Sequence, residues 1–223
     1  AFKMLELMGY DMLRDEYSSQ RLKLWYSRPA KHWTDALPVG NSRLGAMQYG
    51  GAEQEEIQLN EETFWSGGPH HNNSDQAKDA LPKIRELIFQ NKFKDAENLI
   101  NETFLTGQHG MKYLTLGSML LKFPNHDNPD NYYRELDIEK AVAKVRYVKN
   151  GVTYTRTTFS SFADDVIIVR LEASEAKALD FSLGYNCPLE SQVQVKGNKM
   201  IVQCKGVEHE GIPAAMHAEC QIQ

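Results

Sequence analysis

Aromatic side chains next to polar loops are the first feature of this sequence that could do chemistry. Trp33 lies within the polar segment 31–35 (KHWTD), and Trp65 opens the segment 65–71 (WSGGPHH). A sugar ring stacks its C–H face on an aromatic ring, while its hydroxyls need hydrogen-bond donors and acceptors. Tryptophan is mostly buried in proteins, so packing in a core or at an interface is its more common role. The pattern therefore leaves both sugar contact and packing open.

Acidic residues cluster in two places, at 53–56 (EQEE) and at Glu61 and Glu62. Glycoside hydrolysis needs two carboxylates about 5–10 Å apart, facing each other across the scissile bond. Neighbours on an extended chain point to opposite faces, so Glu61 and Glu62 cannot form such a pair. We expect them to be solvated or to accept hydrogen bonds.

Two glycine-rich loops contain side chains that could reach a ligand. The first holds Trp65 and His70, and the second, 107–110 (GQHG), holds Gln108 and His109. Glycines let a backbone approach a ligand or a neighbouring domain, although a plain turn explains the second loop equally well. One loop enters the expected helical segment and the other leaves it, so we expect all four side chains at one edge of the domain.

Several chemistries lack their sequence signatures. The histidines show no metal-site spacing such as H-x-x-x-H, so we expect no metal. No G-x-S-x-G elbow, P-loop or G-x-G-x-x-G occurs, and we expect no cofactor. The cysteines Cys187, Cys204 and Cys220 are odd in number and lack C-x-x-C spacing, so they define neither a zinc site nor a disulfide framework.

Composition favours a globular protein. The 223 residues are 41% hydrophobic and 25% charged, which is too apolar for a disordered chain. The net charge is −5 and the basic residues are scattered, so nucleic acid is not an expected partner. The longest apolar run is far shorter than the roughly 18 residues of a membrane span, so no membrane partner is expected either.

Helical periodicity is confined to one region. A helix is expected to start near Ser74-Asp75, a good N-cap pair, with apolar residues recurring at helical spacing from Ala77 to Ile88. Pro82 argues for a start close to it, since proline is tolerated in a first helical turn. A second helix is expected from Asn91 with Gly107 as its stop. We interpret residues 1–20 as a leader arm outside the functional argument.

Strand patterns dominate the rest. Asn150-Gly151 between alternating segments predicts a hairpin, and residues 193–204 predict another. The continuous β-branched run 166–169 predicts a strand covered on both faces. Two stacked sheets follow, so the expected fold is mainly β, a β-sandwich with an inserted helical hairpin. Residues 217–223 read as the start of a strand without a stop, and we interpret the chain as cut from a longer protein.

Several long, ordered blocks stand out: Leu24–Ala30, Trp33–Met47, Ile57–Pro69, Leu81–Leu87, Leu116-Gly117 and Tyr133–Asp137. They resemble the N-terminal domain of glycoside hydrolase family 95, the inverting α-L-fucosidases. Ser42 departs from the family pattern, where glycine is expected.

The resemblance implies that residues 21–223 form a β-supersandwich, truncated before a catalytic (α/α)6 barrel in the same polypeptide. The acid and the base belong to that barrel, so no catalytic residue is assigned to this chain, and the fragment alone is expected to be inactive. The implied function is to pack on and stabilise the barrel, which binds the fucosylated glycan, with Trp65, His70, Gln108 and His109 as barrel-facing or substrate-rim candidates. An autonomous carbohydrate-binding β-sandwich is the alternative. The resemblance also implies a periplasmic or secreted location, although no signal peptide is visible.

Overall fold

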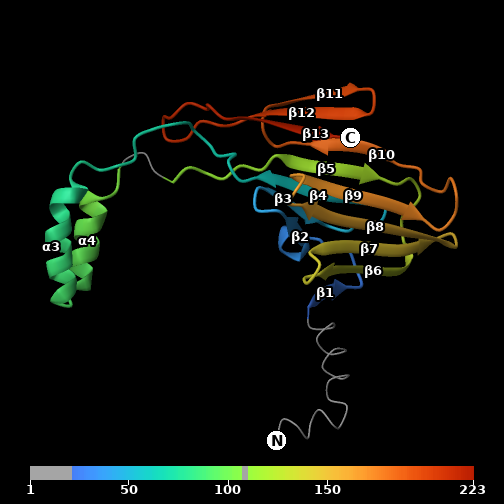
Figure 1. Cartoon of the computed structure of the whole chain (residues 1–223), viewed down its shortest axis with the longest axis horizontal. Coiled ribbons are helices and arrows are strands. Elements are labelled where there is room, and N and C mark those ends of the chain that lie inside the picture. Colours follow the sequence, from blue (N-terminus) through green and yellow to red (C-terminus); the bar gives the residue numbers. More distant parts are fainter. Residues whose placement is uncertain (1–21, 107–109) are drawn as a thin grey trace, which may run out of the picture. The chain divides into compact units, whose positions relative to one another are not determined.

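A computed structural model describes residues 22–106 and 110–223 (Figure 1). The described residues divide into two compact units. The first comprises residues 22–63 and 115–188, and the second comprises the described residues of 64–114 together with 189–223.

The described part of the first unit is built from two five-stranded antiparallel sheets. This arrangement confirms the predicted β-sandwich. One sheet has the order β1 (Lys23–Tyr26), β6 (Asp130–Asp137), β7 (Val142–Lys149), β8 (Val152–Ser161) and β9 (Val166–Ala173); the other has the order β10 (Ser182–Asn186), β5 (Gly117–Lys122), β4 (Gln54–Glu61), β3 (Leu44–Gln48) and β2 (Leu37–Gly40).

The hairpin of β7 and β8 forms the centre of the apolar core. Asn150 and Gly151 have φ angles of 50° and 80°, which is what a two-residue turn of type I′ requires, so the predicted hairpin is confirmed. Alternation along the two strands then directs Val145, Tyr147 and Tyr154 inward, where they are at most 8% exposed.

A buried ion pair joins the two sheets. Arg156 on β8 donates to the Glu55 carboxylate on β4 at 2.5 Å, and both side chains are at most 2% exposed. Glu55 also accepts from the Gly50 amide at 2.6 Å, and Arg156 also donates to the Gly51 carbonyl. Burial raises the pKa of Glu55, and the Arg156 charge opposes this rise. The acidic cluster at 53–56 thus contributes to the core of the sandwich.

Strand β9 corrects one prediction. The run 166–169 was expected to be covered on both faces, but along β9 exposed and half-buried residues alternate. The reason is the two-layer arrangement: one face of a strand is turned toward the other sheet, and no further layer of described strands in the first unit covers the opposite face. An apolar run reports β-propensity and cannot by itself report what covers a strand.

The second unit contains the helical pair and a small sheet. Helix α3 (Ala77–Phe89) and helix α4 (Phe93–Thr103) lie side by side (Figure 1). The three-stranded sheet has the order β11 (Ser191–Lys196), β12 (Lys199–Lys205) and β13 (His217–Ile222). This sheet confirms the hairpin predicted at 193–204 and the final strand.

The start of α3 differs from the prediction. The helix begins at Ala77, so Pro82 lies in its second turn rather than its first. Ser74 precedes the helix and its hydroxyl accepts from the Gln76 amide at 3.2 Å, while it donates to the Thr103 carbonyl at the end of α4. The Ser74 hydroxyl thus links the segment before α3 to the end of α4.

Candidate functional site

The Trp65 loop is held by two other segments of the second unit. The Ser66 amide donates to the Lys112 carbonyl and the Leu114 amide to the Phe64 carbonyl, at 2.8 and 2.9 Å. The Gly67 amide donates to the Val207 carbonyl at 2.8 Å. Gly67 has a φ of 71°, a conformation that glycine adopts without the strain a side chain would bring. The loop is therefore fixed by backbone hydrogen bonds on both sides.

The Trp65 ring lies on the surface of this fixed loop. It is 42% exposed and packs against Tyr113, which is 46% exposed, with the ring centroids 5.0 Å apart. Because residues 64–66 run beside 112–114, the structure brings the Trp65 loop next to the segment that follows residues 107–110. Gln108 and His109 themselves lie outside the described residues.

His70 is oriented by its own loop. Its Nδ1 lies 3.0 Å from the Gly68 carbonyl, and because a carbonyl oxygen can only accept, Nδ1 carries the proton. In a neutral ring Nε2 is then an acceptor. That atom is buried and has no hydrogen-bond partner among the described residues. The ring therefore offers one acceptor to a donor outside the described residues.

The three tryptophans are more exposed than core packing allows. Trp25 is 63% exposed, Trp33 54% and Trp65 42%. Of the two kinds of packing expected for these side chains, packing in a core is therefore excluded for the described residues, and packing at an interface stays a prediction. Trp25 stacks on Tyr133 with ring centroids 6.4 Å apart and an interplanar angle of 21°.

Glu61 accepts hydrogen bonds, as expected, from Arg43 Nε at 3.0 Å and from the backbone and hydroxyl of Thr63 at 2.8 and 2.7 Å. Partial burial acts to raise the pKa of Glu61, but the hydrogen bonds from Thr63 and Arg43 outweigh it, so the pKa lies below its usual range. Glu62 is exposed. Glu61 is thus a structural carboxylate that stays ionised near neutral pH.

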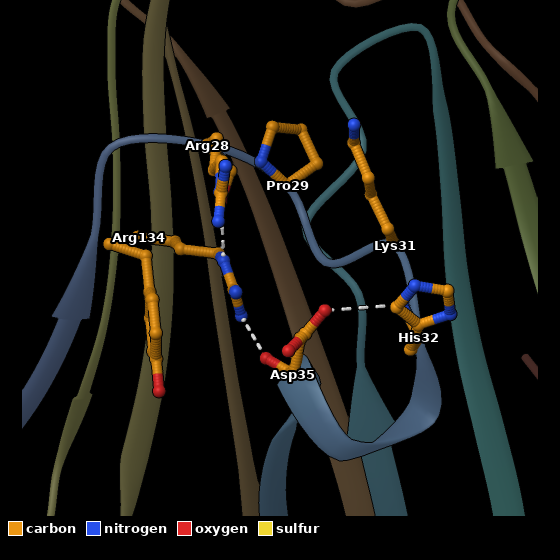
Figure 2. A pocket seen from close by; sticks show the side chains of 7 residues that line it. Arg28, Pro29, Lys31, His32, Asp35 and Arg134 are labelled. Carbon is orange, nitrogen blue, oxygen red and sulfur yellow. Dashed lines mark hydrogen bonds between the residues drawn. The ribbon is translucent and has the colours of Figure 1, made fainter.

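A polar hollow of about 380 Å³ in the first unit is the feature that sequence reasoning missed. Figure 2 shows the segment after β1 curving around it, with Arg134 of β6 reaching in from the neighbouring strand. The side chain of Arg134 lies over the Tyr26 ring, 4.2 Å from its centroid. The hollow is lined by Tyr26, Arg28, Pro29, Lys31, His32, Asp35 and Arg134.

The spacing of these residues gives no signal of the hollow. Arg134 lies about a hundred residues beyond Arg28, and it is strand pairing of β1 with β6 that brings them together. The register between β1 and β6 places Tyr26 opposite Arg134. The alternation of polar and apolar residues along the two strands does not predict this register.

Two further findings limit the chemistry of the described residues. None of the helices in residues 22–106 and 110–223 is long and apolar enough to cross a membrane. Within the same ranges, His, Cys, Asp and Glu side chains form no group of three or more that could hold a metal ion.

The described residues thus form a β-sandwich with surface aromatics and a polar hollow in the first unit, and a helical pair with a small sheet in the second unit. Comparison with known proteins shows the family. Residues 24–223 match the family model described as glycosyl hydrolase family 65, N-terminal domain, and the chain belongs to this family.

The curated relatives are fucosidases, which confirms the predicted likeness to an α-L-fucosidase N-terminal domain. Alpha-L-fucosidase 2 of Arabidopsis thaliana is 35% identical over 83% of the chain and 22% of its own length. Probable alpha-fucosidase A of Aspergillus niger is 34% identical over 69% of the chain and 20% of its own length. The chain thus spans about a fifth of the length of the curated relatives it matches.

Proposed function

We propose that this chain is the N-terminal accessory domain of an α-L-fucosidase, packing on and stabilising a catalytic (α/α)6 barrel in the same polypeptide. The observation that carries the proposal is the match of residues 24–223 to a hydrolase N-terminal domain family, together with relatives named as fucosidases. Membership of the parent protein in glycoside hydrolase family 95 and its periplasmic or secreted location are part of the proposal.

The proposed reaction proceeds with inversion. A carboxylic acid of the barrel protonates the leaving glycosidic oxygen while a carboxylate of the barrel activates a water, which attacks the anomeric carbon from the opposite face. This chain supplies neither group, so the described domain alone is inactive toward fucosides.

The Trp65 loop is the proposed contact with the barrel. Its backbone is fixed by hydrogen bonds to residues 112 and 207, so the exposed rings of Trp65 and Tyr113 form a rigid aromatic surface. Aromatic anchors of this kind dominate interface energetics. The unpartnered Nε2 of His70 on the same loop accepts a hydrogen bond from the barrel or a sugar hydroxyl. Gln108 and His109 complete the proposed substrate rim.

Separate expression of this chain and the proposed barrel tests the role of the loop. We expect the two parts to associate and to hydrolyse a chromogenic α-L-fucoside together, and the chain alone to give no turnover. Trp65→Ala should weaken the association by about tenfold or more, because the loss of one buried aromatic anchor costs ~2 kcal/mol. Trp25→Ala is the matched control, since Trp25 is exposed but lies on β1 in the first unit. Turnover by the chain alone would contradict the proposal.

A second candidate function is an autonomous carbohydrate-binding module. The exposed Trp25 ring, stacked on Tyr133, is a flat platform of the kind on which a sugar packs. If this function is the correct one, a fucosylated oligosaccharide binds the isolated chain, and Trp25→Ala abolishes that binding while Trp65→Ala leaves it unchanged. The same two variants therefore separate the two functions.

A further inference from the structure

The hollow beside Arg134 contains a buried positive charge that belongs to no ion pair among the described residues. Arg134 is 1% exposed. Its Nε donates to the Arg28 carbonyl and its Nη1 to the Asp35 carbonyl, both at 2.8 Å (Figure 2). Both acceptors are neutral, and a guanidinium has five N–H donors in all. Burial lowers the pKa of Arg134, which is the sign of a cation held away from water.

The rest of the lining adds to this charge. Arg28 and Lys31 also line the hollow, and Asp35 is the one carboxylate there. The Asp35 Oδ2 accepts from the His32 amide at 3.3 Å, so this carboxylate stabilises the turn at residues 32–35 that lines the hollow. Among residues 22–106 and 110–223, neither Arg28, Lys31 nor Arg134 belongs to an ion pair. The lining thus carries an excess of positive charge, although the chain as a whole carries −5.

The walls of the hollow are held in place without a ligand. The Ala30 amide donates to the Tyr49 carbonyl at 2.8 Å, and the Asp35 amide donates to the His32 carbonyl at 3.0 Å. Arg134 itself donates hydrogen bonds to both ends of the segment 28–35, at the Arg28 and Asp35 carbonyls. The backbone that carries Arg28 and Lys31 is therefore already ordered, so little backbone entropy is lost when a ligand binds.

We propose that this hollow binds an oxyanion, the carboxylate or sulfate group of an acidic sugar. Arginine side chains bind the oxygens of carboxylates and sulfates through paired N–H donors, and such charge-assisted hydrogen bonds are about twice as strong as neutral ones. The volume, about 380 Å³, lies within the range of small-molecule sites. The inference that the anionic group belongs to a sugar rests on the proposed function, whereas the inference that the hollow prefers an anion rests on the charges of its lining alone.

Isothermal titration calorimetry of the chain with four probes tests the inference. The probes are D-glucuronate, L-fucose sulfate, neutral L-fucose and inorganic sulfate. We expect at least one of the two acidic sugars to bind, about tenfold or more tightly than L-fucose and more tightly than inorganic sulfate, with an affinity that falls as salt is added. Binding of inorganic sulfate without either acidic sugar, or equal binding of neutral fucose, overturns the proposal.

The variants leave the hydrogen bonds of Arg134 intact. Arg28→Gln with Lys31→Gln removes two cations from exposed positions, so folding is retained, and binding of the acidic sugar should fall about tenfold or more. Arg170→Gln is the matched control, because Arg170 is 68% exposed and lies on β9, at the sheet edge opposite β1. Equal losses in both variants, or no loss in the double variant, overturn the site. Turnover of a neutral fucoside by the barrel-containing enzyme should be the same with and without the double substitution, which keeps this test separate from that of the proposed function.

Discussion

Replacing Ser42 with glycine is expected to stabilise this protein. Ser42 lies in the turn between β2 and β3 and has a φ of 82°, in the left-handed region where an L-residue with a Cβ is strained. It stands where the family resemblance leads one to expect glycine, and the backbone angle supplies the physical reason for that expectation.

The side chain of Asn41 holds this turn in place, because it forms hydrogen bonds both within the turn and to β8. The Asn41 side-chain oxygen accepts from the amides of Arg43 and Leu44 at 3.2 and 2.7 Å, and its nitrogen donates to the Ser161 carbonyl at 2.8 Å. Ser42 is exposed, so its hydroxyl is solvated and little is lost with it.

The size of the effect follows from two opposing terms. Removing the strain gains about 1–2 kcal/mol, while glycine costs about 0.5–1 kcal/mol more conformational entropy on folding. The net gain is about 0.5–1 kcal/mol, which raises the melting temperature by about 2 °C for a chain of this size.

Urea unfolding at constant m-value measures this gain as a higher midpoint. Ser182→Gly is the matched control, since Ser182 is exposed in strand β10, and there glycine should lower the free energy of unfolding by about 0.5–1 kcal/mol. The reasoning is refuted if Ser42→Gly destabilises the protein as Ser182→Gly does.

Three further predictions follow from buried groups and one glycine. Arg156→Met should lower the free energy of unfolding by about 3–5 kcal/mol, because it leaves the buried Glu55 carboxyl without its counterion, and adding Glu55→Leu should restore part of the loss; urea unfolding that shows additive losses would contradict this. Burial and the nearby Arg156 and Lys149 charges lower the pKa of His126, so thermal melts should show stability falling as pH drops below about 6.5, where the unfolded histidine takes up a proton that the folded one does not. His126→Gln should flatten that pH dependence, and an unchanged profile counts against the assignment. Gly67→Ala should cost about 1–2 kcal/mol in calorimetry, because φ is 71° and a Cβ would lie 2.9 Å from the Met111 sulfur.

Local sequence determined much of the fold. Asn150-Gly151 specified its hairpin because two residues with positive φ are needed there and few residue types tolerate that. Helical periodicity located the helical pair, and long blocks such as Trp33–Met47 indicated the family, which the match over residues 24–223 supports. These signals lie within one segment, so neighbouring residues suffice to carry them.

What lies across from a strand was decided by the tertiary structure alone. The run 166–169 reads as a strand covered on both faces, yet exposed and half-buried residues alternate along β9, because coverage depends on which layers pack on a strand and not on the strand's own residues. Glu55 reads as part of an acidic cluster, yet it is buried against Arg156, about a hundred residues away in the chain. Arg134 likewise enters the hollow only through the pairing of β6 with β1. The physical reason is the same in each case: burial and charge pairing are properties of contacts between distant segments, and a one-dimensional pattern holds no record of which segments meet.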